Sequence, residues 1–180
     1  MPRFCFLALA LVSLINFATA HAASPENTLF LDLKDGRVVI ELRPDLAPKH
    51  VQRVKQLVGE GFYNGLAFHR VIAGFMAQTG DPKGDGSGGS NYPDLPAEFS
   101  GTSFKRGTVG AARTGDPNSA NSQFFICFED APHLNGSYTV WGQVIEGMQF
   151  VDRIKKSQGS DGRVFNPDKI IRMQLASHAR

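Results

Sequence analysis

Apolar and polar residues alternate along several short stretches of the chain, which is the pattern of half-buried β-strands. This alternation predicts strands at residues 28–33 and 37–42, and the segment from residue 67 to residue 78 contains two more, 67–71 and 75–78. Further short strands are predicted at residues 108–112, 123–128, 139–144 and 169–175. The first two flank Lys34-Asp35-Gly36, and an Asp-Gly pair between alternating segments indicates a hairpin. The sequence therefore predicts a mainly β chain whose first two strands form a hairpin.

Two other segments have the apolar spacing of amphipathic helices. The first covers residues 48–59, where one face carries Val51, Val54, Leu57 and Val58 and glycines follow the segment. The second covers residues 148–156, where the apolar stripe is Met148, Val151 and Ile154. Between the strands, residues 81–106 are rich in Gly, Ser, Pro and Asp and predict a long irregular stretch. Many short strands with two helices favour one antiparallel barrel or sandwich with helical plugs.

The first 22 residues have the layout of a secretory signal peptide. Arg3 precedes an apolar run over residues 4–12, which is extended to Phe17, and both Ala18-Thr19-Ala20 and Ala20-His21-Ala22 fit the small-x-small cleavage pattern. The run is short for a membrane-spanning helix. We therefore expect cleavage of residues 1–22, export, and a single mature domain over residues 23–180. An uncleaved membrane anchor is the alternative.

Composition and charge narrow the classes of function. The chain is 42% apolar and 20% charged, with a formal net charge of +2 and no cluster of Lys and Arg. A nucleic-acid partner and an electrostatic attachment to the membrane are therefore not expected. After loss of the leader only Cys127 is left, so no internal disulfide forms, and its apolar neighbours predict a small buried hydrophobe rather than a nucleophile.

Several common chemistries are not supported by the motifs. Residues 84–89 fit G-x-G-x-x-G by letter, but Asn91-Tyr92-Pro93 cannot continue as the helix that a dinucleotide site needs. Asp81 and Asp85 lack the other ligands of a calcium loop. The histidines have no metal-ligand spacing, and no G-x-S-x-G elbow occurs. We therefore expect no metal, no cofactor and no nucleophile, and a structural role for the glycine-rich loop.

Two blocks nevertheless combine apolar and polar side chains as ligand sites do. In extended geometry Arg70 shares a face with Phe68 and Ile72, Met76 with Gln78, and Gln123 with Phe125. Such faces predict a pocket with an apolar base and a few fixed donors, with Leu134 completing an apolar wall. The alternative is that the aromatic residues and Met76 are only core, and that Arg70 forms a surface ion pair on an apolar stem.

The order of these blocks resembles the cyclophilin family of peptidyl-prolyl cis-trans isomerases. The matching stretches are FHRVI (68–72), GFM (74–76) with Gln78, GD (80–81), GSGG (86–89), SQFFIC (122–127), VWGQV (140–144) and EGM (146–148). They run in family order from about residue 28 to residue 175, which is nearly the whole mature chain. The short connections and the leader are most similar to the bacterial periplasmic branch, which implies a periplasmic location.

The resemblance implies a closed eight-stranded antiparallel barrel, capped by an α-helix at each end, with an active groove on its outer face. Position by position, it assigns catalysis to Arg70, Gln78 and Phe75, with Gln78 orienting the arginine. It assigns substrate binding to Met76, Ala112, Arg113, Gln123, Phe125, His133, Leu134 and Tyr138. Four of these residues, Phe75, Met76, Phe125 and Leu134, would surround the substrate proline, and the backbone of residues 112–114 would bind the peptide.

Four positions depart from the best-known eukaryotic pattern. His133 replaces a Trp that the family associates with cyclosporin binding, so weak cyclosporin binding is expected. Tyr138 replaces a His, and Arg113-Thr114 replaces Asn-Ala. The expected function is isomerisation of X-Pro bonds in unfolded or nascent exported polypeptides, by a monomer that needs no cofactor. A holdase chaperone using the same groove without isomerisation is the competing hypothesis, and an unrelated secreted hydrolase is a weaker third.

Overall fold

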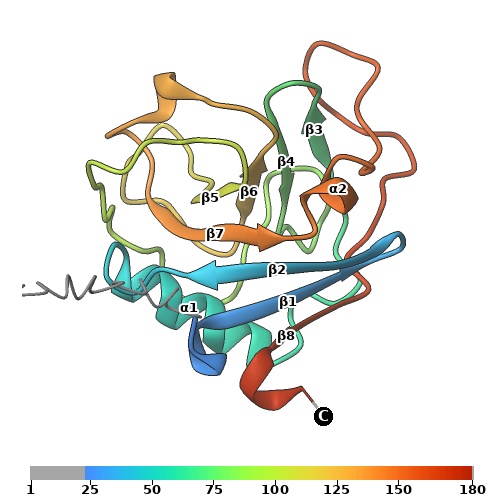
Figure 1. Cartoon of the computed structure of the whole chain (residues 1–180). Coiled ribbons are helices and arrows are strands. Elements are labelled where there is room, and N and C mark those ends of the chain that lie inside the picture. Colours follow the sequence, from blue (N-terminus) through green and yellow to red (C-terminus); the bar gives the residue numbers. More distant parts are fainter. Residues whose placement is uncertain (1–22, 180) are drawn as a thin grey trace, which may run out of the picture.

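The computed structural model of the chain describes residues 23–179 (Figure 1). The strands are β1 (Thr28–Leu33), β2 (Gly36–Leu42), β3 (Arg70–Ile72), β4 (Met76–Thr79), β5 (Thr108–Ala111), β6 (Phe124–Cys127), β7 (Val140–Glu146) and β8 (Arg172–Leu175). The helices are η1 (Pro25–Asn27), α1 (Pro48–Gly59), η2 (Pro132–Leu134), α2 (Met148–Val151) and η3 (Ala176–His178). The signal peptide predicted for residues 1–22 lies outside the described residues.

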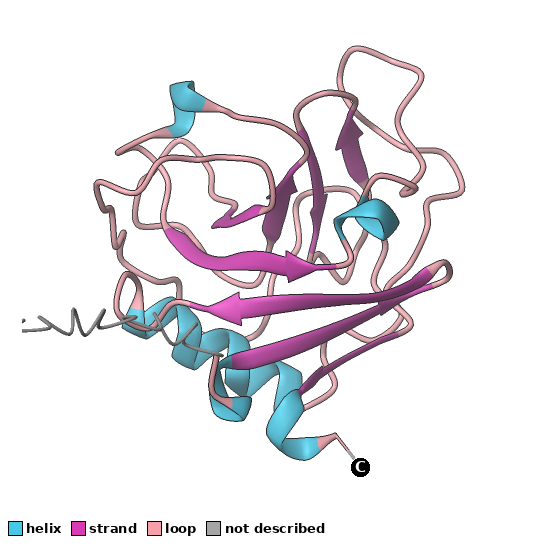
Figure 2. Cartoon of the chain, in the orientation of Figure 1, coloured by secondary structure: helices cyan, strands magenta, loops and turns pink. Residues whose placement is uncertain are grey.

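The eight strands form one antiparallel sheet in the order β3-β4-β6-β5-β7-β2-β1-β8, and the sheet curls on itself (Figure 2). The mainly β fold and the eight antiparallel strands are therefore confirmed. The barrel is less completely closed than expected. The two edge strands, β3 and β8, do not pair with each other, and only an isolated bridge between Ala67 and Lys169 connects the segments that precede them. The outer edge of β3 is instead paired with a later loop, since Val71 N–H donates to Gly162 O and Ser157 N–H donates to Val71 O.

The predicted hairpin is confirmed, with Leu33 paired to Gly36 across the Lys34-Asp35 turn. The glycine at the start of β2 allows close packing of Phe150 from α2. A Cβ on Gly36 would lie 2.5 Å from Cζ of Phe150. The turn and the short helix α2 therefore lie directly against each other.

The second helix is shorter than the predicted 148–156, because it ends at Val151. The following residues tighten into i→i+3 bonds, as when Ile154 N–H donates to Val151 O at 3.0 Å. The backbone then leaves the helix for distant partners, because Lys155 N–H donates to a carboxylate oxygen of Asp168 at 2.8 Å. An apolar stripe marked the segment that packs on the barrel, but only part of it is helical.

The main core fills the barrel between the inner strand faces and α1. It includes Leu31, Ile40, Phe124, Ile126 and Trp141, which are at most 1% exposed. The ring of Phe124 meets that of Trp141 edge to face at 5.4 Å, a favourable aromatic geometry. The apolar face of α1 covers this core with the four residues expected from its spacing, Val51, Val54, Leu57 and Val58.

One predicted face is wrong in part. Phe68 was expected beside Arg70 and Ile72, but it is fully buried in the main core together with Val71. The reason is that regular pairing in this region starts only at Arg70, so strict alternation does not reach back to Phe68. The chain at residues 67–69 instead passes into the barrel.

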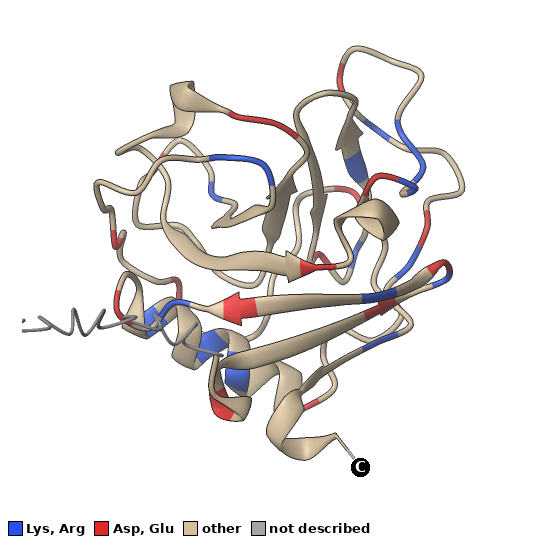
Figure 3. Ribbon diagram, in the orientation of Figure 1, with Lys and Arg blue, Asp and Glu red and all other residues tan. Residues whose placement is uncertain are grey.

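Charged residues of both signs are interspersed over the ribbon rather than gathered on one side (Figure 3). Within residues 23–179, no helix combines the length and apolar character needed to cross a bilayer.

The first turn of α1 is capped by a carboxylate from far along the sequence. Glu98 accepts from the backbone N–H groups of Lys49 at 3.1 Å and His50 at 3.0 Å, and its Oε2 lies 2.7 Å from Nδ1 of His50. Burial lowers the pKa of His50, against the opposing effect of the carboxylate. Burial acts to raise the pKa of Glu98, but its hydrogen bonds outweigh burial and the pKa lies below its ordinary value. The pair is therefore a neutral histidine donating to a carboxylate.

This cap predicts a loss of stability in acid. Both pKa values lie below the ordinary values of 6.5 and 4.5, so the unfolded chain takes up more protons as the pH falls. The free energy of unfolding should be full at pH 7, decline below about pH 6.5 and decline again below about pH 4.5. Glu98→Gln should lower it by about 1–2 kcal/mol at pH 7, measured by urea denaturation.

The matched control is Glu146→Gln, because Glu146 is exposed at the end of β7. It should change the free energy of unfolding by less than about 0.5 kcal/mol. Equal stability of Glu98→Gln and the wild type at pH 7 would contradict the capping role.

Candidate active site

The site is built on one row of cross-strand neighbours. Arg70 of β3 pairs with Gln78 of β4, Gln78 pairs with Phe125 of β6, and Phe125 pairs with Gly110 of β5. Gly110 leaves room for the aromatic ring, because a Cβ there would lie 2.6 Å from Cζ of Phe125 and 2.7 Å from Cε1 of Phe104. Strand register thus places a cation, an amide and an aromatic ring side by side on the outer face.

Below this row lies a second apolar cluster, separate from the main core. Its buried members are Met76, Phe104, Phe125, Cys127, Ala131, Leu134 and Val140. A pocket of about 290 Å³ opens above it and is lined by Arg70, Phe75, Met76, Gln78, Ala112, Arg113, Phe125, His133, Leu134 and Tyr138. Ten of the eleven residues expected at the site thus line one pocket, and Gln123 lines the neighbouring one.

Aromatic contacts fix the walls of this pocket. The ring of Phe125 stacks on Phe104 at 5.8 Å and meets Tyr138 edge to face at 5.9 Å. On the other side of the pocket, the ring centroids of Phe75 and the exposed His133 are 5.1 Å apart. Met76 is 1% exposed and Phe125 is 5% exposed, so both are core residues that also form the pocket floor. The sequence analysis offered two roles for these residues, core packing and a pocket wall, and the structure shows both.

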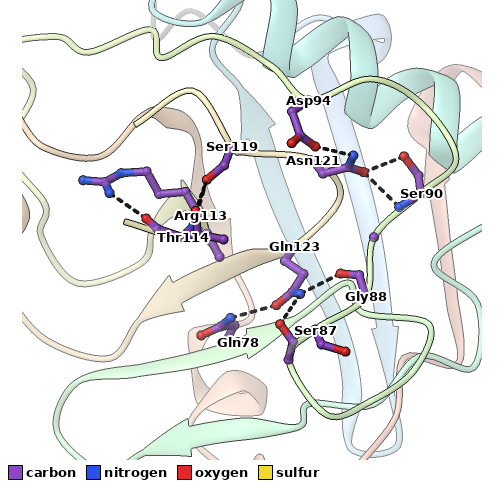
Figure 4. Close-up of a pocket in the computed structure, with 13 residues that line it drawn as sticks. Gln78, Ser87, Gly88, Ser90, Asp94, Arg113, Thr114, Ser119, Asn121 and Gln123 are labelled. Carbon is purple, nitrogen blue, oxygen red and sulfur yellow. Dashed lines mark hydrogen bonds between the residues drawn. The ribbon is translucent and has the colours of Figure 1, made fainter. Parts of the chain in front are cut away.

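A chain of amide hydrogen bonds orients the polar side of the pocket (Figure 4). Nε2 of Gln123 donates to the carbonyls of Gly86 at 3.0 Å and Gly88 at 2.8 Å, so Oε1 of Gln123 is free to accept. It accepts from Nε2 of Gln78 at 2.9 Å. Oε1 of Gln78 in turn accepts from Nη1 of Arg70 at 3.3 Å. Two fixed carbonyls thus decide which way both amides point.

The Arg70 guanidinium is held from two directions. Besides the bond to Gln78, its Nε donates to the backbone carbonyl of Asp161 at 3.2 Å. Among residues 23–179 it forms no ion pair with a carboxylate, so the surface ion pair considered from the sequence is not observed. Of the five N–H donors of a guanidinium, three are left for a ligand.

The glycine-rich loop supplies the carbonyls that end this chain. Its base is Asp81, which is 1% exposed and accepts from the backbone N–H groups of Lys83, Asp85 and Gly86. The loop folds around this carboxylate and no helix follows it, in agreement with the structural role expected for the loop. Within the described chain no cluster of His, Cys, Asp and Glu has the size of a metal site.

A second, more polar pocket of about 350 Å³ adjoins the first and shares Gln78, Ala112 and Arg113 with it (Figure 4). Of its other side chains, Gln123, Ser87 and Thr114 lie in segments that the sequence analysis named, whereas Ser90, Asp94, Ser119 and Asn121 were not singled out. Asn121 connects its walls, because its amide accepts from Ser90 and donates to Asp94. Short polar residues of this kind are common in loops, so their spacing in the sequence did not indicate a pocket.

The side chain of Arg113 forms the ridge between the two pockets. Its guanidinium lies 4.4 Å above the ring of Tyr138, and it donates to the carbonyls of Thr114 and Ser137 at 2.8 Å each. The sequence assigned peptide binding to the backbone of this segment. The structure adds a side chain that ties the segment to the loop carrying Tyr138.

The apolar cluster beneath the pocket contains one thiol, Cys127, which is unsuited to nucleophilic chemistry. Cys127 is fully buried on β6, and burial raises its pKa to about 12. The thiolate is the reactive form of cysteine, so it is almost absent at neutral pH. The prediction of a small buried hydrophobe is confirmed.

Fold and site together define a protein with a curled antiparallel β-sheet and an outer pocket whose apolar floor lies beside a fixed guanidinium. The chain matches the family model described as cyclophilin type peptidyl-prolyl cis-trans isomerase/CLD over residues 28–175. It is 62% identical over 174 residues to a probable peptidyl-prolyl cis-trans isomerase of Brucella suis, covering 90% of this chain and 89% of that protein. It therefore belongs to the family of cyclophilin-type peptidyl-prolyl cis-trans isomerases.

More distant relatives agree with this assignment. Peptidyl-prolyl cis-trans isomerase B of Bacillus subtilis is 44% identical over 121 residues, which cover 66% of this chain and 83% of that protein. A cyclophilin from Hirschia baltica matches with a TM-score of 0.79 at 25% identity, over 88% of this chain and 77% of that one. A Cryptosporidium parvum cyclophilin, crystallised in the presence of the dipeptide Ala-Pro, matches with a TM-score of 0.76 at 26% identity, over 85% of this chain and 99% of that one.

The burial of Cys127 predicts how its thiol reacts. In the folded mature protein, residues 23–180, a chromogenic disulfide reagent at pH 8 should modify less than about a tenth of the thiol in an hour, because the thiolate fraction is small and access is closed. In 6 M guanidinium chloride one thiol per chain should react at once. Rapid reaction of the folded protein would contradict the burial of Cys127 in the apolar cluster beneath the pocket.

Proposed function

We propose that this chain catalyses cis–trans isomerisation of X-Pro peptide bonds. The observation that carries the proposal is the guanidinium of Arg70, held by Gln78 and by Asp161 O at the edge of a pocket whose floor is Met76 and Phe125. Family membership supports the same reaction class. The pocket has a volume of about 290 Å³, and its floor is apolar, as a site for a proline side chain requires.

The reaction needs no nucleophile, which suits the side chains present. Resonance in the peptide bond creates a rotational barrier of about 18–20 kcal/mol. The two X-Pro isomers are close in energy but interconvert over tens to hundreds of seconds. Any interaction that takes the nitrogen lone pair out of conjugation therefore accelerates rotation.

In the proposed mechanism Arg70 stabilises the twisted bond. One N–H donates towards the prolyl nitrogen as it becomes pyramidal, and another holds the adjacent carbonyl. Phe75, Met76, Phe125 and Leu134 hold the ring and exclude water, which strengthens the interaction with the guanidinium. A rate gain of roughly 10⁵ requires only about 7 kcal/mol of differential stabilisation.

We further propose that the mature protein, residues 23–180, acts as a monomer in the periplasm on unfolded exported polypeptides. The support is the leader pattern of residues 1–22 and the mixed surface charge. A holdase that binds the same groove without isomerisation is the competing hypothesis. Client binding by a wild type that catalyses no isomerisation would favour the holdase.

Replacing the arginine tests the catalytic proposal. Arg70→Ala should lower kcat/KM for a proline tetrapeptide roughly 10²–10³-fold, because a fixed donor to the transition state is lost. The rate is measured in a protease-coupled assay, with circular dichroism to verify folding. Arg43→Ala is the matched control, because Arg43 is paired with Asp45 at the surface and should keep the wild-type rate. Unaltered catalysis by folded Arg70→Ala would contradict the mechanism.

The rim residue His133 should set the response to cyclosporin. We expect weak binding by the wild type and at least about tenfold tighter binding by His133→Trp, since the larger ring adds apolar contact worth about 1.4 kcal/mol or more at the exposed rim. Titration calorimetry on both proteins measures the difference. Equal affinities would show that another residue limits binding.

A further inference from the structure

A loop from the C-terminal part of the chain runs along the free edge of β3 (Figure 1). Gly162 O accepts from Val71 N–H at 2.8 Å, Ser157 N–H donates to Val71 O at 3.0 Å, and Val164 N–H donates to His69 O at 3.1 Å. Arg70 itself forms a bridge with Arg163. The loop therefore acts as an additional strand beside the residue that carries the guanidinium.

The turn in this loop contacts the side chain of Arg70 at two places, the Nε atom and the aliphatic stem. Asp161 O accepts from Nε at 3.2 Å, where the guanidinium begins. Gly162 lies against the aliphatic stem, because a Cβ there would be 3.0 Å from Cγ of Arg70 and 2.6 Å from Cγ1 of Ile72. The turn thus leaves the arginine little freedom to swing away from the pocket.

The turn has its own means of keeping this shape. Gly162 has φ +82°, a left-handed conformation that suits glycine. The Asp161 carboxylate accepts from Arg163 N–H at 3.1 Å, so the side chain closes the turn while the carbonyl remains available to Arg70. An acceptor and a close approach are therefore both prepared before any ligand binds.

We propose that the Asp161-Gly162 turn is a positioning element for Arg70, in addition to Gln78. Gln78 fixes the end of the guanidinium, and the turn fixes its stem and Nε. The inference rests on the proposed isomerase function, in which Arg70 stabilises the twisted peptide bond. The turn acts through Arg70 and does not itself touch the substrate.

A pair of glycine variants separates positioning from backbone strain. Gly162→Ala places a methyl group against Arg70, whereas Gly65→Ala imposes the same strain at φ +80° with no heavy atom within 4 Å of its Cβ. Gly162→Ala should lower kcat roughly 10- to 100-fold with KM within about twofold, since small misplacements of a catalytic group have effects of that size. Gly65→Ala should keep both constants. Equal kcat for Gly162→Ala and Gly65→Ala would overturn the proposal.

Arginine-resolved NMR gives a readout that does not depend on catalysis. In the wild type, the Nε–H of Arg70, assigned by its loss in Arg70→Lys, should exchange slowly with solvent because it is hydrogen-bonded. Exchange should be at least about tenfold faster in Gly162→Ala and unchanged in Gly65→Ala. If Gly162→Ala does not fold, Asp161→Ala, which opens the turn without a clash, should show the same acceleration. Slow exchange in these folded variants would overturn the positioning role.

The two proposals fail separately. A wild type with protected Nε–H but no isomerisation would overturn the proposed function alone. If the wild type is active, and the Gly162→Ala variant has the same kcat and the same Nε–H protection, the positioning role alone would be overturned.

Discussion

The site depends on the burial of β4 and β6 on both of their faces. Ala77, Phe124 and Ile126 face the barrel interior, whereas Met76 and Phe125 face the outer cluster. Strands with a period of two can serve both cores only in one register, because a slip by one residue would exchange the two sets of side chains. The register that fills the barrel therefore also builds the pocket floor and sets Gln78 between Arg70 and Phe125.

On this apolar floor, the polar groups are oriented by backbone rather than by opposite charge. Carbonyls of Gly86 and Gly88 orient the two glutamines, and the carbonyl of Asp161 holds Arg70. Neutral acceptors fix a guanidinium without cancelling its charge, as a nearby carboxylate would. Such preorganised donors act most strongly where water is excluded. The arrangement therefore suits a reaction in which a change of charge distribution, and no covalent step, must be stabilised.

The local sequence pattern was sufficient to predict those elements that depend on neighbouring residues alone. Alternation located the first two strands, Asp-Gly located the hairpin between them, and the resemblance named ten residues that line one pocket. Prediction was weaker where distant backbone decides the outcome. The loop that pairs with β3 occupies the edge at which the barrel would close, and the bond from Lys155 N–H to Asp168 directs the chain away after the second helix has ended at Val151. The part played by Asp161 belongs to its main-chain oxygen, so side-chain chemistry could not have indicated it.

The central claim is that a fixed guanidinium lowers the barrier to rotation in the bound peptide. The most direct test is the cis–trans exchange rate of a proline tetrapeptide on the enzyme, measured by NMR exchange spectroscopy at saturation for the wild type and Arg70→Lys. Lysine keeps the charge but loses the planar donors that Gln78 and Asp161 orient. The account predicts on-enzyme exchange at least about 100-fold slower in Arg70→Lys with similar peptide affinity. Equal on-enzyme exchange in the two proteins would contradict it.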